Sequence, residues 1–463
     1  MKARRDAGLR ARTAEAARAL AAWAAEAVRG DLPDAVRDRA ALILADDLGA
    51  MVAAADEPPV ARMRAVLARS SGVPEATVFA PGAPRLDRAS AASANGLAAT
   101  WCELDEGYRG APCHAGAYVL PALLAEAEAR SETVSAVLAA LAVSYEIAVR
   151  CARAFPFETM TVHPHAAFAT IGAAAGIGLI RGFDAERLLD AVSAAATMAF
   201  AGPYDHAIEG ALVRNAWTSA GAWIGLRAAD GAEAGIAGLP ESFYDVFAGA
   251  FGTGCVPQAL AEGLGTDWAV LGGYHKVFAC CQYAHAAIEA TLALRQRFAG
   301  CRPEEIEEIV VETHPRGLTL TNVEPATVLA AKFSMPHAVA ASAITGTGGQ
   351  GAFDQRTLDD PQIAALRRRV RLEALPEIGP PPHDRPSRVT WRLRDGAWLT
   401  ELCESARGGA DQPFDTGTML EKLRETTRGF PRMASCLGAI VQGGRGAAPW
   451  RDCVAEMTSE VVR

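Results

Sequence analysis

The histidines are the side chains of this chain that are best suited to acid–base chemistry near neutral pH, because the unperturbed pKa of imidazole is about 6.5. Nine are present among 463 residues. His114 and His163 each precede a stretch of small residues that favours the start of a helix. His285 and His337 fall within predicted helices, and the stretch 283–292 also fits an ordinary amphipathic helix. An isolated histidine is more often a surface or core residue than a catalytic one, so other features must single these out.

Three carboxylates form an acidic cluster shortly before His114, and they are Glu103, Asp105 and Glu106. One of them could orient a histidine, or serve as an acid–base group whose pKa is raised by its surroundings. The alternative is a solvated cluster at the end of a helix, and that interpretation is preferred for Glu106. Glu103 and Asp105 are therefore the candidate catalytic carboxylates.

Arg214 and Lys276 are the candidate cations for binding a carboxylate substrate. An Arg guanidinium can bind a carboxylate through two parallel hydrogen bonds, whereas a Lys ammonium acts as a point charge. Lys276 is nearly as well explained as a surface lysine at the end of a loop. The adjacent Cys280 and Cys281 could suggest a nucleophile, but packing beneath the start of the following helix explains them better.

Composition and charge exclude several functional classes. The formal net charge of −9 argues against a nucleic-acid partner or an anionic membrane surface, although a local basic pocket could still bind an anionic substrate. The ten cysteines contain no CxxC pair, so we expect reduced cytosolic thiols and no metal site. The basic start of the chain lacks the apolar core of a signal peptide, and the apolar stretch 134–149 is interrupted by polar residues. These features predict a cytoplasmic protein that does not span a membrane.

Hydrophobic periodicity divides the chain into two regions that must position these residues. From about residue 13 to residue 261, apolar residues recur at three- and four-residue spacing, which predicts helices, several of them buried among other helices. Four later segments instead have the pattern of strands: 305–313, 369–375, 387–394 and 397–403. Asp395-Gly396 joins the last two and predicts a hairpin.

The predicted fold class is mainly α, with a large all-helical domain and an inserted, smaller α+β lid domain. The helical domain would comprise residues 1–262 and would be completed by the helical segment 416–463. The lid domain would comprise residues 263–415.

Four separated blocks carry a resemblance to a known family. They are Asn95-Gly96 through Glu103-Leu104-Asp105-Glu106 to His114-Ala115-Gly116 and Val119-Leu120-Pro121-Ala122; His163-Pro164 with Gly172-Ala173-Ala174-Ala175; Glu209-Gly210 with Val213-Arg214-Asn215 and a small-residue helix ending at Gly225; and Lys276 through Cys280-Cys281 to His285, followed by Lys332-Phe333-Ser334-Met335-Pro336-His337. Each block alone is a weak signal. In this consistent order, the chain resembles the MmgE/PrpD family of 2-methylcitrate dehydratase, cis-aconitate decarboxylase and iminodisuccinate epimerase.

The resemblance implies a homodimer, a site in the cleft between the two domains, and no metal or organic cofactor. It supports a set of catalytic candidates, which are His114, His163, Glu103, Asp105, His285 and His337. The substrate-binding candidates are Arg214, Lys276 and Ser334, although capping of a helix explains Ser334 equally well.

The chain also departs from the family pattern at four positions. The family usually has Asp where this chain has Glu103, and His-Pro-Gly where it has His114-Ala115-Gly116. A Lys that several members use in the pocket aligns with Arg214, and a Tyr of the decarboxylase aligns with His337. The resemblance therefore does not identify the substrate.

The reactions of this family remove or deliver a proton, or release carbon dioxide, at a carbon next to a carboxylate. Without a cofactor, such chemistry needs a base tuned near neutrality, a cation for the carboxylate and an acid for the leaving group. The leading prediction is a hydro-lyase that removes water from a small hydroxy-di- or tricarboxylate. The alternatives are an epimerase, a decarboxylase and a catalytically silent binding member of the family.

Overall fold

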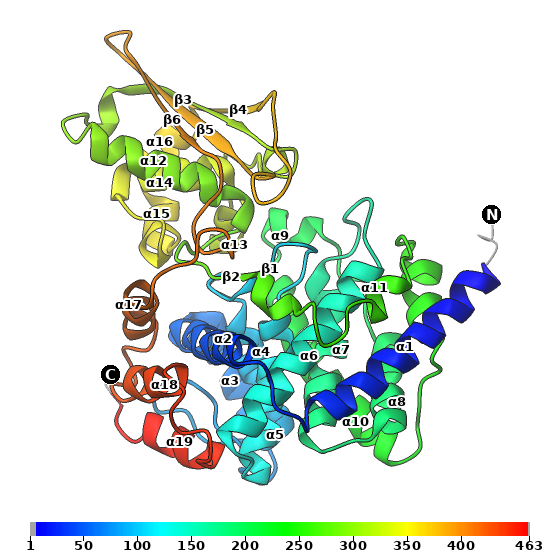
Figure 1. The fold of residues 1–463 in the computed structure, drawn as a ribbon. Coiled ribbons are helices and arrows are strands. Elements are labelled where there is room, and N and C mark those ends of the chain that lie inside the picture. The colour runs from blue at the N-terminus through cyan, green and yellow to red at the C-terminus, as the bar shows by residue number, and fades with distance from the viewer. Residues whose placement is uncertain (1–5, 462–463) are drawn as a thin grey trace.

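The computed structural model describes residues 6–461, and most of these residues lie in helices (Figure 1). The larger part, called the helical body below, contains α1 (Ala7–Ala27), α2 (Asp34–Ala53), α3 (Pro58–Ser70), α4 (Arg88–Ala99), α5 (Ala115–Arg130), α6 (Val134–Ala154), α7 (Pro164–Ile180), α8 (Ala185–Thr197), α9 (Asp205–Glu209), α10 (Ala216–Glu233) and α11 (Gln258–Ala261). Two short strands of the body, β1 (Gly107–Tyr108) and β2 (Gly273–Tyr274), pair antiparallel. The predicted mainly α fold class is confirmed.

The centre of the helical body is the closely packed pair α7 and α10. Every residue of α7 is buried, in accord with a sequence that is apolar nearly all round. Glycines on α10 allow the two backbones to approach: a Cβ added at Gly225 would lie 2.4 Å from the Cβ of Ala173. This contact holds the start of α7 and the segment before α10 in fixed positions, and both carry candidate site residues.

Helix α6 is long and apolar enough, by length and composition, to cross a membrane. However, 83% of its most apolar window is buried inside the molecule. Burial of this extent is typical of a core helix, and α6 packs against α2, α5 and α7.

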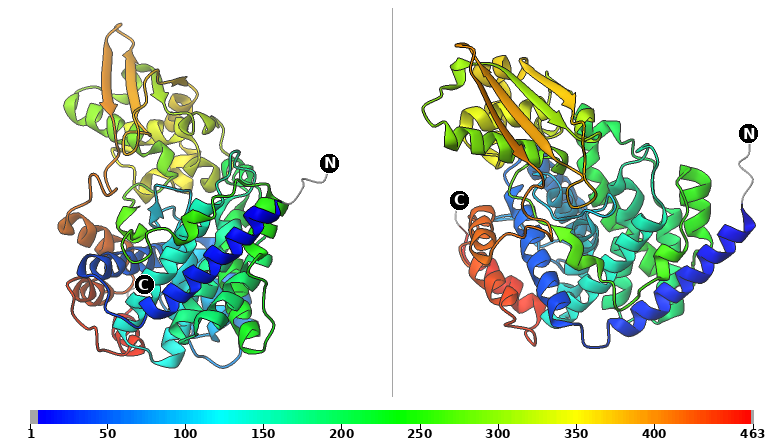
Figure 2. Two further views of the ribbon diagram at one scale, coloured as in Figure 1. Left: turned by 45° about the vertical axis from the view of Figure 1, so that its right-hand side comes forward. Right: turned by 45° about the horizontal axis from the view of Figure 1, so that its top comes forward.

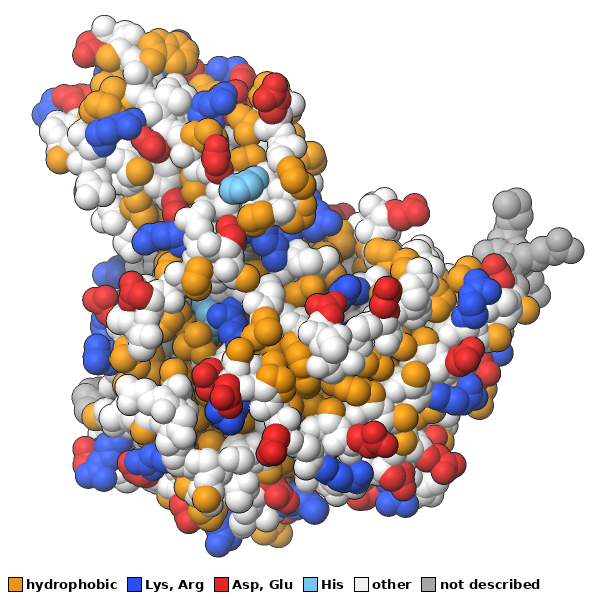
Figure 3. All heavy atoms as spheres, in the orientation of Figure 1, with side chains coloured by type: hydrophobic (Ala, Val, Ile, Leu, Met, Phe, Trp, Pro, Cys, Tyr) orange, Lys and Arg blue, Asp and Glu red, His pale blue; other side chains and the backbone are white. Residues whose placement is uncertain are grey.

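The smaller part, called the lid below, runs from residue 285 to residue 403 and forms a separate lobe (Figures 1 and 3). Its sheet has the strand order β4-β3-β5-β6. The strands are β3 (Ile306–Thr313), β4 (Val370–Ala374), β5 (Ser387–Leu393) and β6 (Trp398–Cys403). Strand β3 is parallel to β4 and antiparallel to β5, and β5 and β6 form an antiparallel hairpin.

Helices cover one face of this sheet (Figure 2). The helices of the lid are α12 (His285–Arg297), α13 (Val328–Lys332), α14 (Met335–Thr345), α15 (Gln355–Asp359) and α16 (Pro361–Arg367). Helix α12 packs on β5 and β6, and α14 contacts β4. The edge strand β6 alternates between half-buried and exposed residues, as expected for this one-sided cover, whereas most residues of β5 are buried.

After the lid, the chain returns to the helical body through α17 (Thr416–Thr426), α18 (Met433–Val441) and α19 (Trp450–Met457). These helices pack against α2 and α5 (Figure 1). A buried charge cluster joins the two ends of the chain: Asp46 Oδ1 lies 2.5 Å from Lys422 Nζ, and Asp46 Oδ2 lies 2.6 Å from His275 Nδ1. Strand β2 follows the predicted bound at 262/263 but pairs with β1 of the helical body. The domain bounds at 262/263 and 415/416 stay a prediction.

Candidate active site

Four of the sequence-predicted residues line one small cavity. Glu103, His114, His163 and Arg214 all contribute to its wall, and its volume is about 60 Å³. His114 is the N-cap residue of α5 and His163 that of α7, while Arg214 lies in the turn just before α10. Side chains that lie in the lid or in the segments leading to its helices complete the wall, among them Tyr283, Phe333 and Arg385.

His114 is oriented by acceptors on one side of its ring. Its Nδ1 lies 2.8 Å from Asp105 Oδ2 and 2.9 Å from the carbonyl oxygen of Glu106. Because both partners are acceptors, Nδ1 carries the proton and Nε2 remains for the cavity. Burial alone would raise the pKa of the Asp105 carboxyl, but Lys276 and His114 hold it below its usual range. The ionised Asp105 therefore fixes the orientation of the His114 ring.

His163 is held as a neutral ring. Its Nδ1 lies 3.1 Å from the backbone N–H of His165, and its Nε2 lies 3.4 Å from Nε of Arg214. Both neighbours are donors, so a doubly protonated imidazolium would face donors at each nitrogen. Burial and the Arg214 charge lower the pKa of His163 well below its usual value. His163 is therefore unprotonated at neutral pH, the state that a general base must have before it accepts a proton.

Arg214 is a fixed cation beside this ring, and only 1% of the residue is exposed. Its Nη1 lies 2.5 Å from Glu103 Oε1, and its guanidinium carbon lies 5.2 Å from the centre of the Phe333 ring. Glu103 has a backbone φ of 54°, in the left-handed region that costs a non-glycine residue about 1–3 kcal/mol. Strain of this kind is typical of functional sites, and here it directs a carboxylate towards Arg214.

Lys276 lies behind the cavity wall and is fully buried. Its Nζ lies 3.2 Å from Asp105 Oδ1 and 3.5 Å from Glu103 Oε2. Burial opposes the charged ammonium, but the two carboxylates raise the pKa of Lys276 above its usual value. The interpretation of Lys276 as a surface lysine is therefore wrong, because it connects the two carboxylates that hold Arg214 and His114.

Two family models match the chain one after the other. The model of the MmgE/PrpD N-terminal domain matches residues 18–257, and that of the MmgE/PrpD C-terminal domain matches residues 278–436. The chain belongs to the MmgE/PrpD family. The resemblance inferred from the four sequence blocks is thus confirmed.

Relatives within the MmgE/PrpD family include fungal proteins. The cis-aconitate decarboxylase of Aspergillus terreus is 25% identical over 435 residues, which is 87% of each chain. The cis-aconitate decarboxylase-like protein oryM of Aspergillus oryzae is 25% identical over 431 residues, which is 87% of this chain and 88% of that protein. The similarity therefore extends over the helical body and the lid together.

In this MmgE/PrpD protein, two histidines expected in the pocket do not line the cavity. His285 Nε2 lies 3.2 Å from the carbonyl oxygen of Cys280. His337 Nε2 lies 3.0 Å from the carbonyl oxygen of Ala352, and its Nδ1 lies 3.1 Å from Nη1 of Arg367. Burial lowers the pKa of His285 to about 3 and that of His337 to about 4. Ring nitrogens of both histidines are hydrogen-bonded within the protein, and neither ring lines the cavity. The geometry therefore does not support the catalytic roles that were predicted for His285 and His337.

Ser334 also lies outside the cavity wall. Its hydroxyl accepts the backbone N–H of His337 at 3.0 Å and so caps α14, as the alternative interpretation proposed. Cys281 does line the cavity, but burial raises the pKa of its thiol to about 11. A thiol of that pKa is a poor nucleophile at neutral pH.

The sequence reasoning missed His165. Its ring lies between the other two histidines, with centroid distances of 5.1 Å to His114 and 4.4 Å to His163. Its Nδ1 lies 2.9 Å from the hydroxyl oxygen of Tyr118. The available signal was the His-Pro-His spacing at 163–165, which places a second imidazole on the first turn of the same helix.

The interpretation of Glu106 as a solvated residue is wrong, because Glu106 is fully buried. Its Oε1 accepts the backbone N–H of Gly116 at 2.7 Å, and its Oε2 accepts the hydroxyl of Tyr145 at 3.0 Å. Burial raises the pKa of its carboxyl to about 8. Its carbonyl oxygen, described above, contacts His114 and so links this buried group to the candidate site.

Proposed function

We propose that this protein is a cofactor-independent lyase of the dehydratase type. It would abstract a proton next to a carboxylate of a small hydroxy-di- or tricarboxylate and expel water. The observation that carries the proposal is the neutral His163 beside the buried cation Arg214, with Nε of Arg214 3.4 Å from Nε2 of His163. A neutral base next to a fixed positive charge is what proton abstraction from such a carbon requires.

The proposed roles follow from the charges of the neighbours. His163 accepts the proton, while Arg214 binds the adjacent carboxylate and stabilises the negative charge that develops on it. His114, whose Nδ1 lies 2.8 Å from Asp105 Oδ2, donates a proton to the leaving hydroxyl group. Lys276 offsets the negative charges of Glu103 and Asp105. These two carboxylates in turn hold Arg214 and His114 in position.

A second candidate is decarboxylation, and the names of the Aspergillus relatives favour it. Loss of carbon dioxide needs an acid that protonates the product carbon, but it needs no base. The neutral His163 favours the dehydratase proposal over this alternative, because a ring whose pKa lies well below its usual value is not protonated at neutral pH and so cannot serve as the acid.

The test is proton NMR in heavy water with a panel of hydroxy-dicarboxylates, hydroxy-tricarboxylates and unsaturated tricarboxylates. Elimination is expected to give new vinyl proton signals from a hydroxy acid, without carbon dioxide. Release of carbon dioxide from an unsaturated tricarboxylate would favour the decarboxylase, and deuterium exchange without net conversion would indicate an epimerase.

Two controls belong to this assay. The His163→Ala protein should lose the signal, which excludes a contaminating enzyme. Activity should also survive exhaustive treatment with a chelator, and loss of activity that zinc or iron restores would contradict the proposal of a cofactor-independent reaction.

A further inference from the structure

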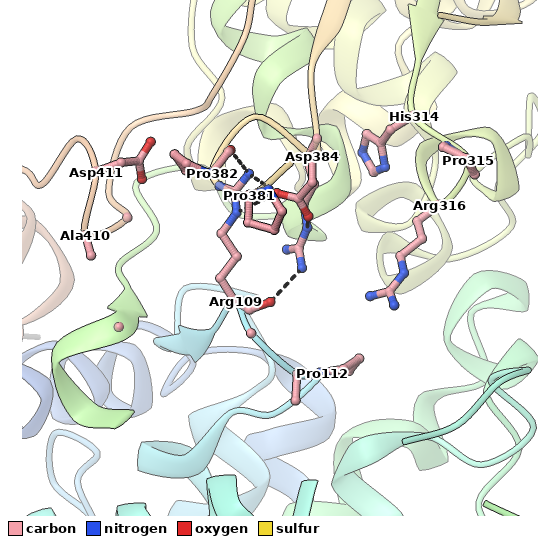
Figure 4. Close-up of a pocket in the computed structure, with 15 residues that line it drawn as sticks. Arg109, Pro112, His314, Pro315, Arg316, Pro381, Pro382, Asp384, Ala410 and Asp411 are labelled. Atoms are coloured by element: carbon pink, nitrogen blue, oxygen red, sulfur yellow. Dashed lines mark hydrogen bonds and ion pairs between the residues drawn. The ribbon is translucent and has the colours of Figure 1, made fainter. Parts of the chain in front are cut away.

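A larger cleft adjoins the small cavity on the lid side. Its volume is about 730 Å³, and it lies between the segment after β1 and two loops of the lid (Figure 4). The side chain of Arg316 points into this open space from the lid, opposite Pro112 of the helical body (Figure 4). Pro112 and Arg385 line both the cleft and the inner cavity, so the two spaces meet at these residues.

The inner cavity is too small for a whole di- or tricarboxylate. At about 60 Å³ it has room for only about two water molecules of about 30 Å³ each. One end of a substrate, held by Arg214 and His163, would fill it. The rest of the molecule must then extend past Pro112 and Arg385 into the outer cleft.

The outer cleft contains an excess of positive charge. The Arg109 guanidinium is already paired, because its Nη2 and Nε lie 2.8 Å and 3.2 Å from Asp384 Oδ1. The carboxylate of Asp411 accepts the hydroxyl of Ser405 at 2.7 Å. Among residues 6–461, no carboxylate lies within 4.0 Å of the Arg316 guanidinium, whose Nη1 donates to the Tyr283 hydroxyl at 3.1 Å.

Arg385 provides a second cation at the point where the two spaces meet. It is only 8% exposed, and its Nε lies 3.5 Å from Asp384 Oδ2, a carboxylate that it shares with Arg109. Its Nη1 donates to Gln282 Oε1, and its Nη2 donates to the carbonyl oxygen of Arg109 at 3.1 Å. Its guanidinium carbon lies 5.2 Å from the centre of the Tyr283 ring, and that of Arg316 lies 5.8 Å from the same centre. The two arginines therefore flank one aromatic ring that also lines the inner cavity.

We propose that Arg316 and Arg385 form a second anion subsite, which binds the carboxylate of the substrate farthest from the reacting carbon. This inference rests on the proposed function and assigns the residues that hold the second carboxylate of its substrate. The Arg316 guanidinium, which has no carboxylate partner within residues 6–461, can form bidentate, charge-assisted hydrogen bonds with such an anion, and Arg385 adds a second positive charge nearby.

Calorimetric titration with tricarballylate, an unreactive aliphatic tricarboxylate, tests the subsite in the full-length protein. Arg316→Gln is expected to raise the Kd for tricarballylate about tenfold, a loss of about 1.4 kcal/mol. Arg316→Lys should recover part of this loss, since it restores the charge without the fork geometry. Butyrate, which has a single carboxylate, should show a Kd that changes less than about twofold on the same substitution.

The matched control is Arg62→Gln, because Arg62 is an exposed arginine on α3 with no ion pair within residues 6–461. Its Kd for tricarballylate should equal that of the unmodified protein. The subsite would be excluded if Arg316→Gln left the Kd unchanged, if Arg62→Gln weakened binding equally, or if tricarballylate failed to bind at millimolar concentration.

The same variants separate this inference from the proposed function. If binding depends on Arg316 but no polycarboxylate of the panel is converted, the proposed reaction fails and the subsite stands. If a substrate is converted and Arg316→Gln changes neither its KM nor the Kd of tricarballylate, the subsite fails and the proposed reaction stands.

Discussion

The proposed base makes a direct prediction for catalysis at the residue scale. Replacing His163 with Ala should lower kcat by about 10²-fold or more, the usual scale for loss of general acid–base catalysis. The same substitution at His383, an exposed histidine of the lid, serves as the control and should leave kcat unchanged. Steady-state kinetics on the substrate found by NMR checks this, and equal rates for His163→Ala and the original protein would exclude His163 as the base.

Arg214 should affect binding more than turnover. Arg214→Lys keeps a positive charge and should be partly tolerated, whereas Arg214→Ala should raise KM much more than it lowers kcat. Because Arg214 is buried against Glu103, removing it costs about 3–5 kcal/mol of stability, so thermal unfolding must confirm that each variant is folded. A variant that binds substrate normally but turns it over slowly would contradict the assignment.

The sequence alone was enough to find four residues of the cavity wall, Glu103, His114, His163 and Arg214. They occur in the motif blocks that carry the family resemblance, and their types match the chemistry. The state of Glu106 was not predictable, because it depends on burial under α2, which is far away in the sequence. His285 shows a different error. Its position in a motif block predicted a place in the pocket, but its Nε2 lies 3.2 Å from the carbonyl oxygen of Cys280 and the residue does not line the cavity.

At the scale of elements, local signals predicted the strands well. The hairpin expected around Asp395-Gly396 is β5 and β6, and Gly396 has the positive φ, 89°, that such a turn favours. The parallel pairing of β3 with β4 could not be predicted, because the two strands are separated by several helices and only tertiary packing brings them together. Helix existence was likewise predicted better than helix bounds, since the helical region expected from about residue 13 to residue 261 is divided into separate helices, among them α4 at Arg88–Ala99.

The packing of α10 on α7 predicts a large cost for a single methyl group. Gly225→Ala would place a Cβ 2.4 Å from the Cβ of Ala173 and 2.7 Å from the backbone nitrogen of Ala174, so one helix must shift. We expect the free energy of unfolding to fall by about 1–3 kcal/mol, the usual cost of overpacking.

The matched control is Gly438→Ala in the interior of α18, where the nearest atom is the flexible end of Leu420 at 3.4 Å. This substitution should be neutral or stabilising, because Ala has the higher helix propensity. Denaturant titration of both variants checks the prediction, and equal stabilities would show that α7 and α10 do not constrain each other.

For the whole molecule, the buried histidines predict that stability falls in mild acid. Burial lowers the pKa of six of them: His163, His165, His275, His285, His314 and His337. The unfolded chain, with histidine pKa values of about 6.5, binds more protons below that pH, so protonation favours unfolding. The raised pKa values of four carboxyl groups, Asp47, Glu106, Glu146 and Asp190, act in the opposite direction, but the six histidines outnumber them.

We therefore expect Tm to decrease steadily as the pH falls from about 6.5 to 4.5. Differential scanning calorimetry at several pH values measures this, and His337→Gln should reduce the slope because one titrating group is removed. A Tm that stayed constant over this range would mean that the histidines are not held neutral in the folded state.

The homodimer and the cytoplasmic location stay predictions at this scale. Hydrophobic side chains gather on the face of the helical body below the lid (Figure 3), and a surface of this kind is typical of an interface between subunits. Sedimentation velocity at micromolar concentration should give a dimer, and a stable monomer there would contradict the prediction.

The cluster of Asp46, Lys422 and His275 also has a consequence for synthesis on the ribosome. Lys422 is made long after Asp46, about 20–75 seconds later at elongation rates of about 5–20 residues per second. Throughout that interval the nascent α2 carries a carboxylate whose ammonium partner does not yet exist, and burying it would be unfavourable. We therefore expect the packing of α2 in the helical body to be completed only after Lys422 has emerged from the ribosome.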